Sequence, residues 1–190
     1  MSTAGHQETE IKIRLRDVSE GRLLLQEAGF LVHVERTQED NFVFDTADGA
    51  LRQSGRLLRL RHAGGSALLT YKGPSIPGRH KSREEIETSV GNPNNFQLIL
   101  ENLGYLISFR YQKYRSEYTR RGEPGTVTLD ETPIGTFFEL EGPPDWIDLT
   151  ARRFGFSEKD YITASYGSLY LEHRDRNPDA GRDMVFPLPL

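Results

Sequence analysis

Glu8-Thr9-Glu10-Ile11-Lys12-Ile13-Arg14-Leu15-Arg16, close to the N-terminus, is the stretch that decides the fold. Every even-numbered position in it is charged, whereas Ile11, Ile13 and Leu15 occupy odd positions. Successive side chains of a β-strand point to opposite faces, so the stretch predicts a strand with one ionic and one apolar face. Along the ionic face, two carboxylates come first and the basic groups follow. A single strand of this kind usually turns its charges to water, so the later strands must show whether this one does.

Composition narrows the class of protein. A length of 190 residues suits one domain with a substantial core. The net charge of −4 and the pI near 5.8 argue against a nucleic-acid partner. The absence of cysteine excludes disulfides, thiolate nucleophiles and cysteine metal sites. No apolar run could span a bilayer and no signal-peptide core is present, so we expect a cytoplasmic protein without a membrane partner.

The rest of the chain repeats the two-faced strand pattern between amphipathic helices. Alternation predicts further strands at residues 30–36, 41–45, 57–62, 67–72, 83–88, 105–118, 126–131 and 137–141. Apolar spacing and capping residues predict helices at 17–29, 93–104, from 143 to about 154, and at 165–172, the last preceded by a helix-start box at 157–160. We expect a leader at 1–7, one domain at 8–173 and a tail at 174–190 that is disordered or loosely docked.

The charged faces of these strands carry complementary chemistry. The acids are Glu8, Glu10, Glu85, Glu87, Asp130, Glu139 and Glu141, and the bases are Lys12, Arg59, Arg61, Lys72, Arg83, Lys113 and Arg115. Two architectures can hold them. Either the apolar faces line an ordinary core and the charges face water, or the sheet closes into a barrel with the charges inside. The amphipathic helices need an apolar sheet face to pack on, which favours the barrel.

A charged barrel interior is costly unless it binds something, because buried ions lose hydration and like charges repel. A polyphosphate with a divalent metal offsets that cost. Lys and Arg bind phosphate oxygens, and clustered carboxylates hold Mg²⁺ or Mn²⁺ through oxygen ligands. The interior set therefore predicts a site for a metal-bound triphosphate.

The same residues resemble the CYTH superfamily, which includes class IV adenylyl cyclases, thiamine triphosphatases and inorganic triphosphatases. Glu8-x-Glu10-x-Lys12 is similar to the family's ExExK signature. The family's later blocks are matched in order by residues 41–46, Leu58-Arg59-Leu60-Arg61, residues 70–74, Arg83-x-Glu85-x-Glu87, Lys113-x-Arg115, Leu129-Asp130 and residues 138–141. The resemblance covers residues 8–172, and residues 71–74 with Ser165-Tyr166 look most like the cyclase-like branch.

What the resemblance implies is an α+β fold, namely a closed antiparallel eight-stranded triphosphate tunnel with helices packed outside. By that resemblance the metal-facing residues are Glu8, Glu10, Asp130, Glu139 and Glu141. The phosphate-gripping residues are Lys12, Arg59, Arg61, Lys72, Arg83, Lys113 and Arg115, with Glu85 and Glu87 holding these bases in place. Lys12, Glu139 and Glu141 are expected to be catalytic. Lys12 would act as a general base only with a strongly depressed pKa, so phosphate contact is its commoner role.

Three functions are compatible with these residues. A cyclase would convert ATP to cyclic AMP and pyrophosphate, and a triphosphatase would hydrolyse inorganic, thiamine or nucleoside triphosphate. A non-catalytic polyphosphate- or nucleotide-binding module would bind without turnover. We expect Mg²⁺ or Mn²⁺ as cofactor, a triphosphate as small-molecule partner and a homodimer as the candidate oligomer. The basic loop at 79–81 is a possible lid, the histidines lack metal-ligand spacing, and Tyr166 is expected to be a core aromatic.

Overall fold

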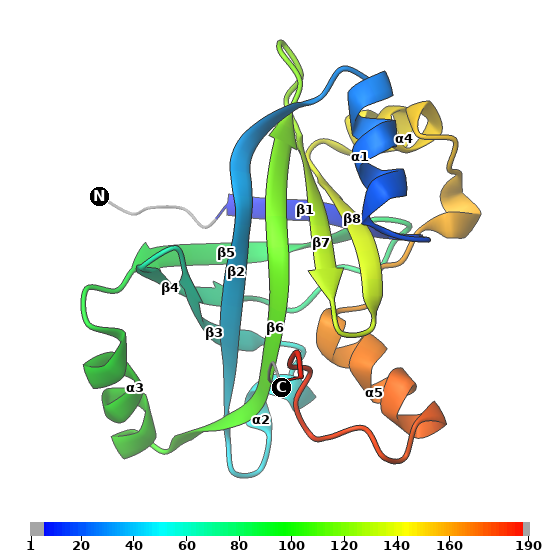
Figure 1. The fold of residues 1–190 in the computed structure, drawn as a ribbon. Helices are drawn as coiled ribbons and strands as arrows, with labels where there is room; N and C mark the ends of the chain where they lie inside the picture. Colours follow the sequence, from blue (N-terminus) through cyan, green and yellow to red (C-terminus); the bar gives the residue numbers. More distant parts are fainter. Residues whose placement is uncertain (1–5, 188–190) are drawn as a thin grey trace.

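The centre of the computed structural model, which describes residues 6–187, is a closed antiparallel barrel (Figure 1). Its eight strands follow the order β1-β5-β4-β3-β2-β6-β7-β8. They are β1 His6–Leu15, β2 Leu31–Thr46, β3 Leu57–Ala63, β4 Ser66–Lys72, β5 Lys81–Ser89, β6 Tyr105–Thr119, β7 Thr126–Thr132 and β8 Gly135–Glu141. The prediction of a closed eight-stranded barrel is confirmed. β1 closes it by pairing with both β5 and β8.

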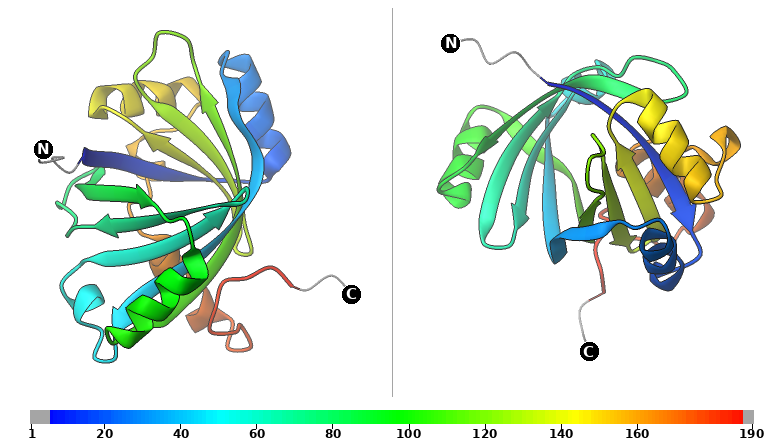
Figure 2. Two further views of the ribbon diagram at one scale, coloured as in Figure 1. Left: turned by 90° about the vertical axis from the view of Figure 1, so that its left-hand side faces the viewer. Right: turned by 90° about the horizontal axis from the view of Figure 1, so that it is seen from above.

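Helices cover the outside of the barrel, as Figure 2 shows from two directions. They are α1 Val18–Glu27, α2 Ala50–Gln53, α3 Pro93–Asn102, α4 Pro144–Arg153, the 3₁₀ helix η1 Glu158–Asp160 and α5 Tyr166–Arg176. Helices α1 and α4 pack on the β1–β8 side, whereas α3 packs on β6. No helix among residues 6–187 is long and apolar enough to cross a bilayer.

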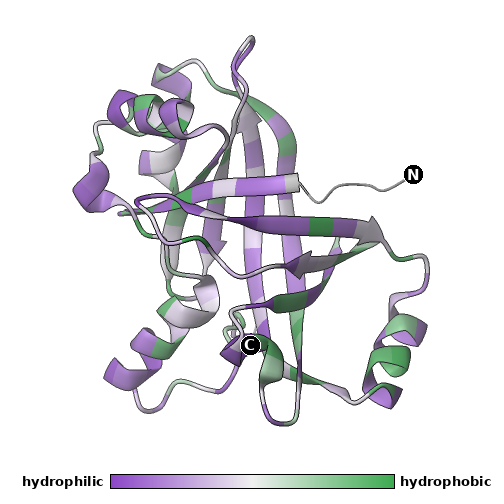
Figure 3. Cartoon of the chain, turned by 180° about the vertical axis from the view of Figure 1, so that it is seen from behind, coloured by the Kyte–Doolittle hydropathy of each residue, from purple (hydrophilic) through white to green (hydrophobic). Residues whose placement is uncertain are grey.

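The apolar face of each strand points outward, toward the helices. Ile11, Ile13 and Leu15 of β1 are buried in a cluster with residues of α1 and α4. Leu60 of β3 is buried in a second cluster that includes Leu100 of α3. The alternation that separates the two faces appears as bands of hydrophilic and hydrophobic residues in Figure 3. The charged faces therefore line the interior, and the water-facing architecture is excluded.

Three local expectations are corrected. Residues 30–36 and 41–45 are parts of one strand, β2, because irregularities in its pairing with β6 near Val32, Val34 and Thr37 interrupt the alternation without ending the strand. Residues 46–55, for which no helix was predicted, contain α2, which forms because the Asp45 carboxylate accepts the amides of Leu51 and Arg52. The box at 157–160 caps η1, and α5 has its own cap at residue 165.

The segment after α5 is attached to the barrel rather than loosely docked. Met184 is fully buried, and its backbone forms a parallel bridge with β6 at Tyr111. The Tyr170 hydroxyl donates to the carbonyls of Gly181 and Asp183. Only residues 188–190 of the expected tail, and 1–5 of the expected leader, lie outside the described residues. The sequence suggested loose attachment because one buried methionine in a polar segment has no periodic signal.

Candidate active site

A single cavity of about 900 Å³ occupies the barrel interior. Of the fourteen charged residues that the sequence singles out, all but Asp130 line it. They converge because the inward positions of neighbouring strands face one another across the barrel. Lys12 lies opposite Glu139 in the β1–β8 register, and Glu10 lies opposite Glu141. The cavity is thus built from segments at opposite ends of the chain.

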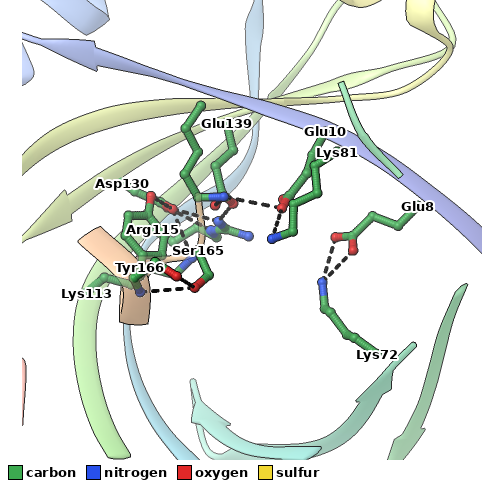
Figure 4. Close-up of polar contacts among 12 residues, drawn as sticks. Glu8, Glu10, Lys72, Lys81, Lys113, Arg115, Asp130, Glu139, Ser165 and Tyr166 are labelled. Atoms are coloured by element: carbon green, nitrogen blue, oxygen red, sulfur yellow. Dashed lines mark hydrogen bonds and ion pairs between the residues drawn. The ribbon is translucent and has the colours of Figure 1, made fainter. Parts of the chain in front are cut away.

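One wall carries Glu8 and its basic partners, of which Figure 4 shows Lys72. Lys72 Nζ donates to both Glu8 carboxylate oxygens at 2.7 Å and lies 3.0 Å from Glu85. Arg83 reaches Glu8 at 3.4 Å. Burial disfavours the charged form of Glu8 and the nearby Glu10 adds to this, but Lys72 outweighs both and keeps its pKa below the ordinary value.

Lys12 lies at the centre of the second group of ion pairs. Its ammonium is 3.3 Å from Glu10 and 3.0 Å from Glu139, with 2% of the residue exposed. Burial lowers the pKa of Lys12, yet the two carboxylates more than compensate and raise it above the ordinary value. The same contacts hold the pKa values of Glu10 and Glu139 below theirs despite burial. The two carboxylates thus favour the charged form of Lys12, which suits phosphate contact better than a general-base role.

Asp130 lies behind the cavity wall and does not line it. It is fully buried, and its oxygens accept from Lys113 at 2.9 Å, from Arg115 at 2.7 and 2.6 Å, and from the Tyr166 hydroxyl at 2.7 Å. Arg115 also forms a very close ion pair with Glu139. All of these donors converge on one carboxylate, so the geometry makes Asp130 a support for the basic side chains.

The opposite wall is formed by β2, β3 and β6. Arg59 donates to the Tyr111 hydroxyl and to Thr70, both at 3.1 Å. Arg61 lies 3.3 Å from Glu39 and 3.4 Å from Glu87. These contacts fix the two arginines with their guanidinium groups inside the barrel, where an anion would meet them as forked donors.

Sequence reasoning missed three residues at this site. Lys81 lines the cavity 3.1 Å from Glu10, and burial lowers its pKa to about 8. Glu39 is buried between Arg61 and Lys113. Lys81 and Glu39 are odd-numbered, like the other inward-facing residues of their strands. The predicted strands began only at residues 83 and 41, so neither residue was included. Tyr166 was expected only in the core, yet it lines the cavity with its ring 5.2 Å from the ammonium groups of Lys12 and Lys113.

The carboxylates offer the donor chemistry that a divalent metal requires. Glu8, Glu10, Glu139 and Glu141 present only oxygen ligands, which suit Mg²⁺ and Mn²⁺. Within residues 6–187 no three acidic or histidine side chains converge on one point, because three of these carboxylates are engaged by bases. Glu141, at the end of β8, is exposed, but the barrel wall shields its carboxyl group from part of the surrounding water. This shielding raises its pKa, and the nearby Glu8 and Glu10 carboxylates raise it further, to about 7. A cation would relieve this repulsion, so the residues fit a metal.

Comparisons with known proteins agree with this geometry. A family model described as the CYTH domain matches residues 6–166. A relative from Methanocaldococcus jannaschii, named "Putative adenylate cyclase", is 31% identical over 134 residues that cover 70% of this chain and 75% of the relative. A solved structure from Vibrio parahaemolyticus, also described as a "putative adenylate cyclase", is 25% identical with a TM-score of 0.77, covering 88% of this chain and 99% of that one.

A further solved structure shares the fold at lower identity. It is a "putative adenylyl cyclase" from Hippeastrum, described as having a dominant triphosphatase activity, with 21% identity and a TM-score of 0.64 over 88% of this chain and 96% of that one. The family match spans most of the chain, and the closed barrel carries the ordered charges expected from it. The chain therefore belongs to the CYTH domain family.

Proposed function

We propose that the protein is a metal-dependent enzyme that binds a triphosphate inside the barrel and converts ATP to cyclic AMP and pyrophosphate. The observation that carries this proposal is the cavity inside the barrel, in which carboxylates lie beside the seven predicted bases and Lys81. Such a set neutralises a polyphosphate chain and orients it. Relatives named as adenylate cyclases support the choice of reaction.

The rest of the cavity favours a nucleotide over an inorganic substrate. Beyond the ionic walls the lining includes Val43, Phe44, Leu57, Phe109 and Leu171. Inorganic triphosphate has no apolar part to bury there, whereas the base and ribose of a nucleotide do. A volume of about 900 Å³ also lies within the range usual for small-molecule sites.

In this proposal the basic residues bind and orient the phosphates. Lys12 of β1 and Lys113 and Arg115 of β6 meet phosphate oxygens near Glu139, and Arg59 and Arg61 meet them from β3. Asp130 keeps Lys113 and Arg115 in place rather than binding metal. Glu85 and Glu87 hold Lys72 and Arg61 in the same way, at 3.0 and 3.4 Å.

Glu8, Glu10, Glu139 and Glu141 would hold Mg²⁺ or Mn²⁺, which when bound neutralises phosphate charge. The barrel wall limits water around the phosphates, and the bases fix the α-phosphorus relative to the ribose. In the cyclase reaction the ribose 3′-oxygen forms a bond to the α-phosphorus, the bond to the pyrophosphate oxygen breaks, and the hydroxyl proton passes to solvent. The bases stabilise the charge that develops on the leaving pyrophosphate.

A triphosphatase is the second candidate, and the activity described for the Hippeastrum protein supports it. In that reaction water attacks the terminal phosphorus and the diphosphate part of the substrate leaves. The same acids and bases would serve both reactions, and the position of the attacking hydroxyl distinguishes them.

Product analysis tests the proposal. The protein is incubated with ATP, thiamine triphosphate or inorganic triphosphate in Mg²⁺ or Mn²⁺, and the products are separated. Cyclic AMP with pyrophosphate in equal amounts supports the cyclase. Phosphate release without cyclic AMP supports the triphosphatase instead. Saturable binding of all three without turnover would reject both enzymes and leave a binding module.

A further inference from the structure

Asp148 is a buried carboxylate on the outward side of the barrel that the reaction does not use. It lies on α4, is 7% exposed and has three side-chain partners from two other segments. Arg79 lies 2.7 Å from one carboxylate oxygen, and His80 Nε2 lies 2.8 Å from the other. The Tyr161 hydroxyl donates to that second oxygen at 3.0 Å. A buried carboxylate with this many partners fixes each of them.

Both of the segments that Asp148 holds lead directly to a cavity lysine. Arg79 and His80 end the loop between β4 and β5, and the next residue, Lys81, points into the cavity toward Glu10. On the other side, Tyr161 precedes Ile162, whose backbone exchanges two hydrogen bonds of 2.8 Å with the backbone of Lys12. Asp148 therefore connects, from outside the barrel, two of the ammonium groups inside it.

The β4–β5 loop has little else to hold it in this position. Before β5 begins at Lys81, which pairs with Glu10 of β1, the other anchors are the backbone hydrogen bonds from Gly73 to Glu84 and from Ile76 to Ser82. The Ile76 side chain is 58% exposed. Arg79 also approaches Glu158, but at 3.9 Å and with that carboxylate largely in solvent. A weak exposed pair of this kind contributes little. Asp148 is thus the main side-chain attachment of the loop residues that immediately precede Lys81.

We propose that Asp148 is a positioning residue: it latches the β4–β5 loop to α4 so that Lys81 stays in the cavity, where Lys81 binds a phosphate oxygen of the substrate. Only this last step rests on the proposed function. Loss of the latch frees the loop end, moves the ammonium of Lys81 out of the cavity and removes one of the cations that grip the triphosphate.

Amine labelling tests the latch without reference to activity. The chain has five lysines, of which Lys12, Lys72, Lys81 and Lys113 line the cavity and Lys159 is exposed. Acetic anhydride labelling followed by mass spectrometry should modify Lys159 in every variant, whereas Lys81 of the wild type should react slowly because it is 8% exposed and paired with Glu10. In Asp148→Asn we expect Lys81 labelling to rise about tenfold, with Lys12 and Lys113 still protected. Unchanged protection of Lys81 overturns the proposal.

Kinetics then test whether the latch acts through Lys81. Asp148→Asn should raise KM for the turned-over triphosphate about tenfold with kcat within about twofold, because a lost ground-state phosphate contact is uniform binding. In a Lys81→Ala background the same substitution should raise KM by less than about a further twofold, since the effects of coupled residues are not additive. A further tenfold rise in KM in the Lys81→Ala background would show that Asp148 acts by another route and would overturn the proposal.

Two further variants separate positioning from a general fault in folding. Glu158→Gln neutralises the neighbouring exposed carboxylate and should leave labelling and KM unchanged. Arg79→Gln with His80→Gln breaks the latch from the loop side while α4 stays intact, and it should reproduce the Asp148→Asn labelling of Lys81. Failure of this pair to do so contradicts the latch. If the wild type turns over no triphosphate, the proposed function fails, whereas the labelling result still decides the latch.

Discussion

At the scale of single residues, Glu141 is a cavity carboxyl whose charge opposes folding. The pKa of Glu141 is raised from 4.5 to about 7 by its surroundings and by Glu8 and Glu10. A carboxyl that binds its proton more tightly when folded loses stability as pH rises from about 4.5 to 7. Because solvent screens this exposed group, we expect Glu141→Gln to stabilise the protein at pH 8 by only on the order of 1 kcal/mol, while activity collapses.

Thermal melts between pH 4 and 8 check this prediction. The stability of the wild type should fall relative to that of Glu141→Gln across the pH window, and the two should agree near pH 4. Glu84→Gln, which neutralises an exposed carboxylate at an outward position of β5, is the control and should change neither stability nor activity. A variant that is less stable than the wild type at pH 8 would place Glu141 in a favourable ion pair instead.

Glu39 has the opposite behaviour. Burial disfavours its charge, but Lys113, Arg115 and Arg61 hold its pKa at about 2, below the ordinary 4.5. Its stabilisation is therefore present above about pH 4.5 and lost as pH falls toward 2. Glu39→Gln should cost about 2–3 kcal/mol at pH 7 because Arg61 and Lys113 each lose one of their two carboxylate partners inside the barrel. Urea unfolding at pH 7 and pH 3 measures this, and the difference should shrink at pH 3. Glu131→Gln, which breaks the surface pair with Arg36, should cost less than about 1 kcal/mol at both.

At the scale of elements, α4 depends on a close approach between its tryptophan and the loop before β7. A Cβ built on Gly125 would lie 2.3 Å from two atoms of the Trp146 ring. The indole cannot move freely, since its Nε1 donates to Glu123 at 2.8 Å and the ring is buried in the cluster below α4. Gly125→Ala should therefore displace α4 and cost about 1–3 kcal/mol or more.

Fluorescence of Trp146, the single tryptophan in the chain, reports directly on this displacement. Gly125→Ala should shift the emission and lower Tm. Gly91→Ala is the matched control, because its Cβ would meet no atom within 4 Å. Equal Tm values for the two variants would contradict the tight packing of α4 on this loop. A shift of α4 would also carry Asp148 with it, so the Gly125 variant is expected to weaken the latch of the β4–β5 loop.

At the scale of the whole molecule, the charges inside the barrel are paired only with one another. Ligands that pair with them should therefore stabilise the folded protein strongly. Mg²⁺ together with a triphosphate should raise Tm, because binding to the folded state adds about 2.7 kcal/mol at a ligand concentration of 100 Kd. Arg59→Ala should reduce this shift and weaken turnover.

EDTA in excess should abolish turnover, since the carboxylates would then repel the substrate. Full activity in EDTA would rule out the metal-dependent mechanism.

The sequence by itself determined the two-faced strands, most of the residues that line the cavity and the family. Alternation is a local property: it separates Arg59 and Arg61 from Leu58 and Leu60 without any knowledge of the fold. Ordered blocks of charge then identify the family, because their order along the chain is preserved whatever the register between strands. The helices were also predictable, since apolar spacing and caps such as Asn92-Pro93 act within a few residues.

Tertiary structure alone decided how the charges pair. Alternation by itself is symmetric between the two faces of a strand; the amphipathic helices favoured an ionic interior, and closure of β1 onto β5 and β8 establishes it. Closure also sets the register that joins Lys12 to Glu139, and it withdraws Asp130 from the cavity surface behind Lys113 and Arg115. Pairings of this kind join residues far apart in the chain, so their energies depend on distances that no local pattern encodes.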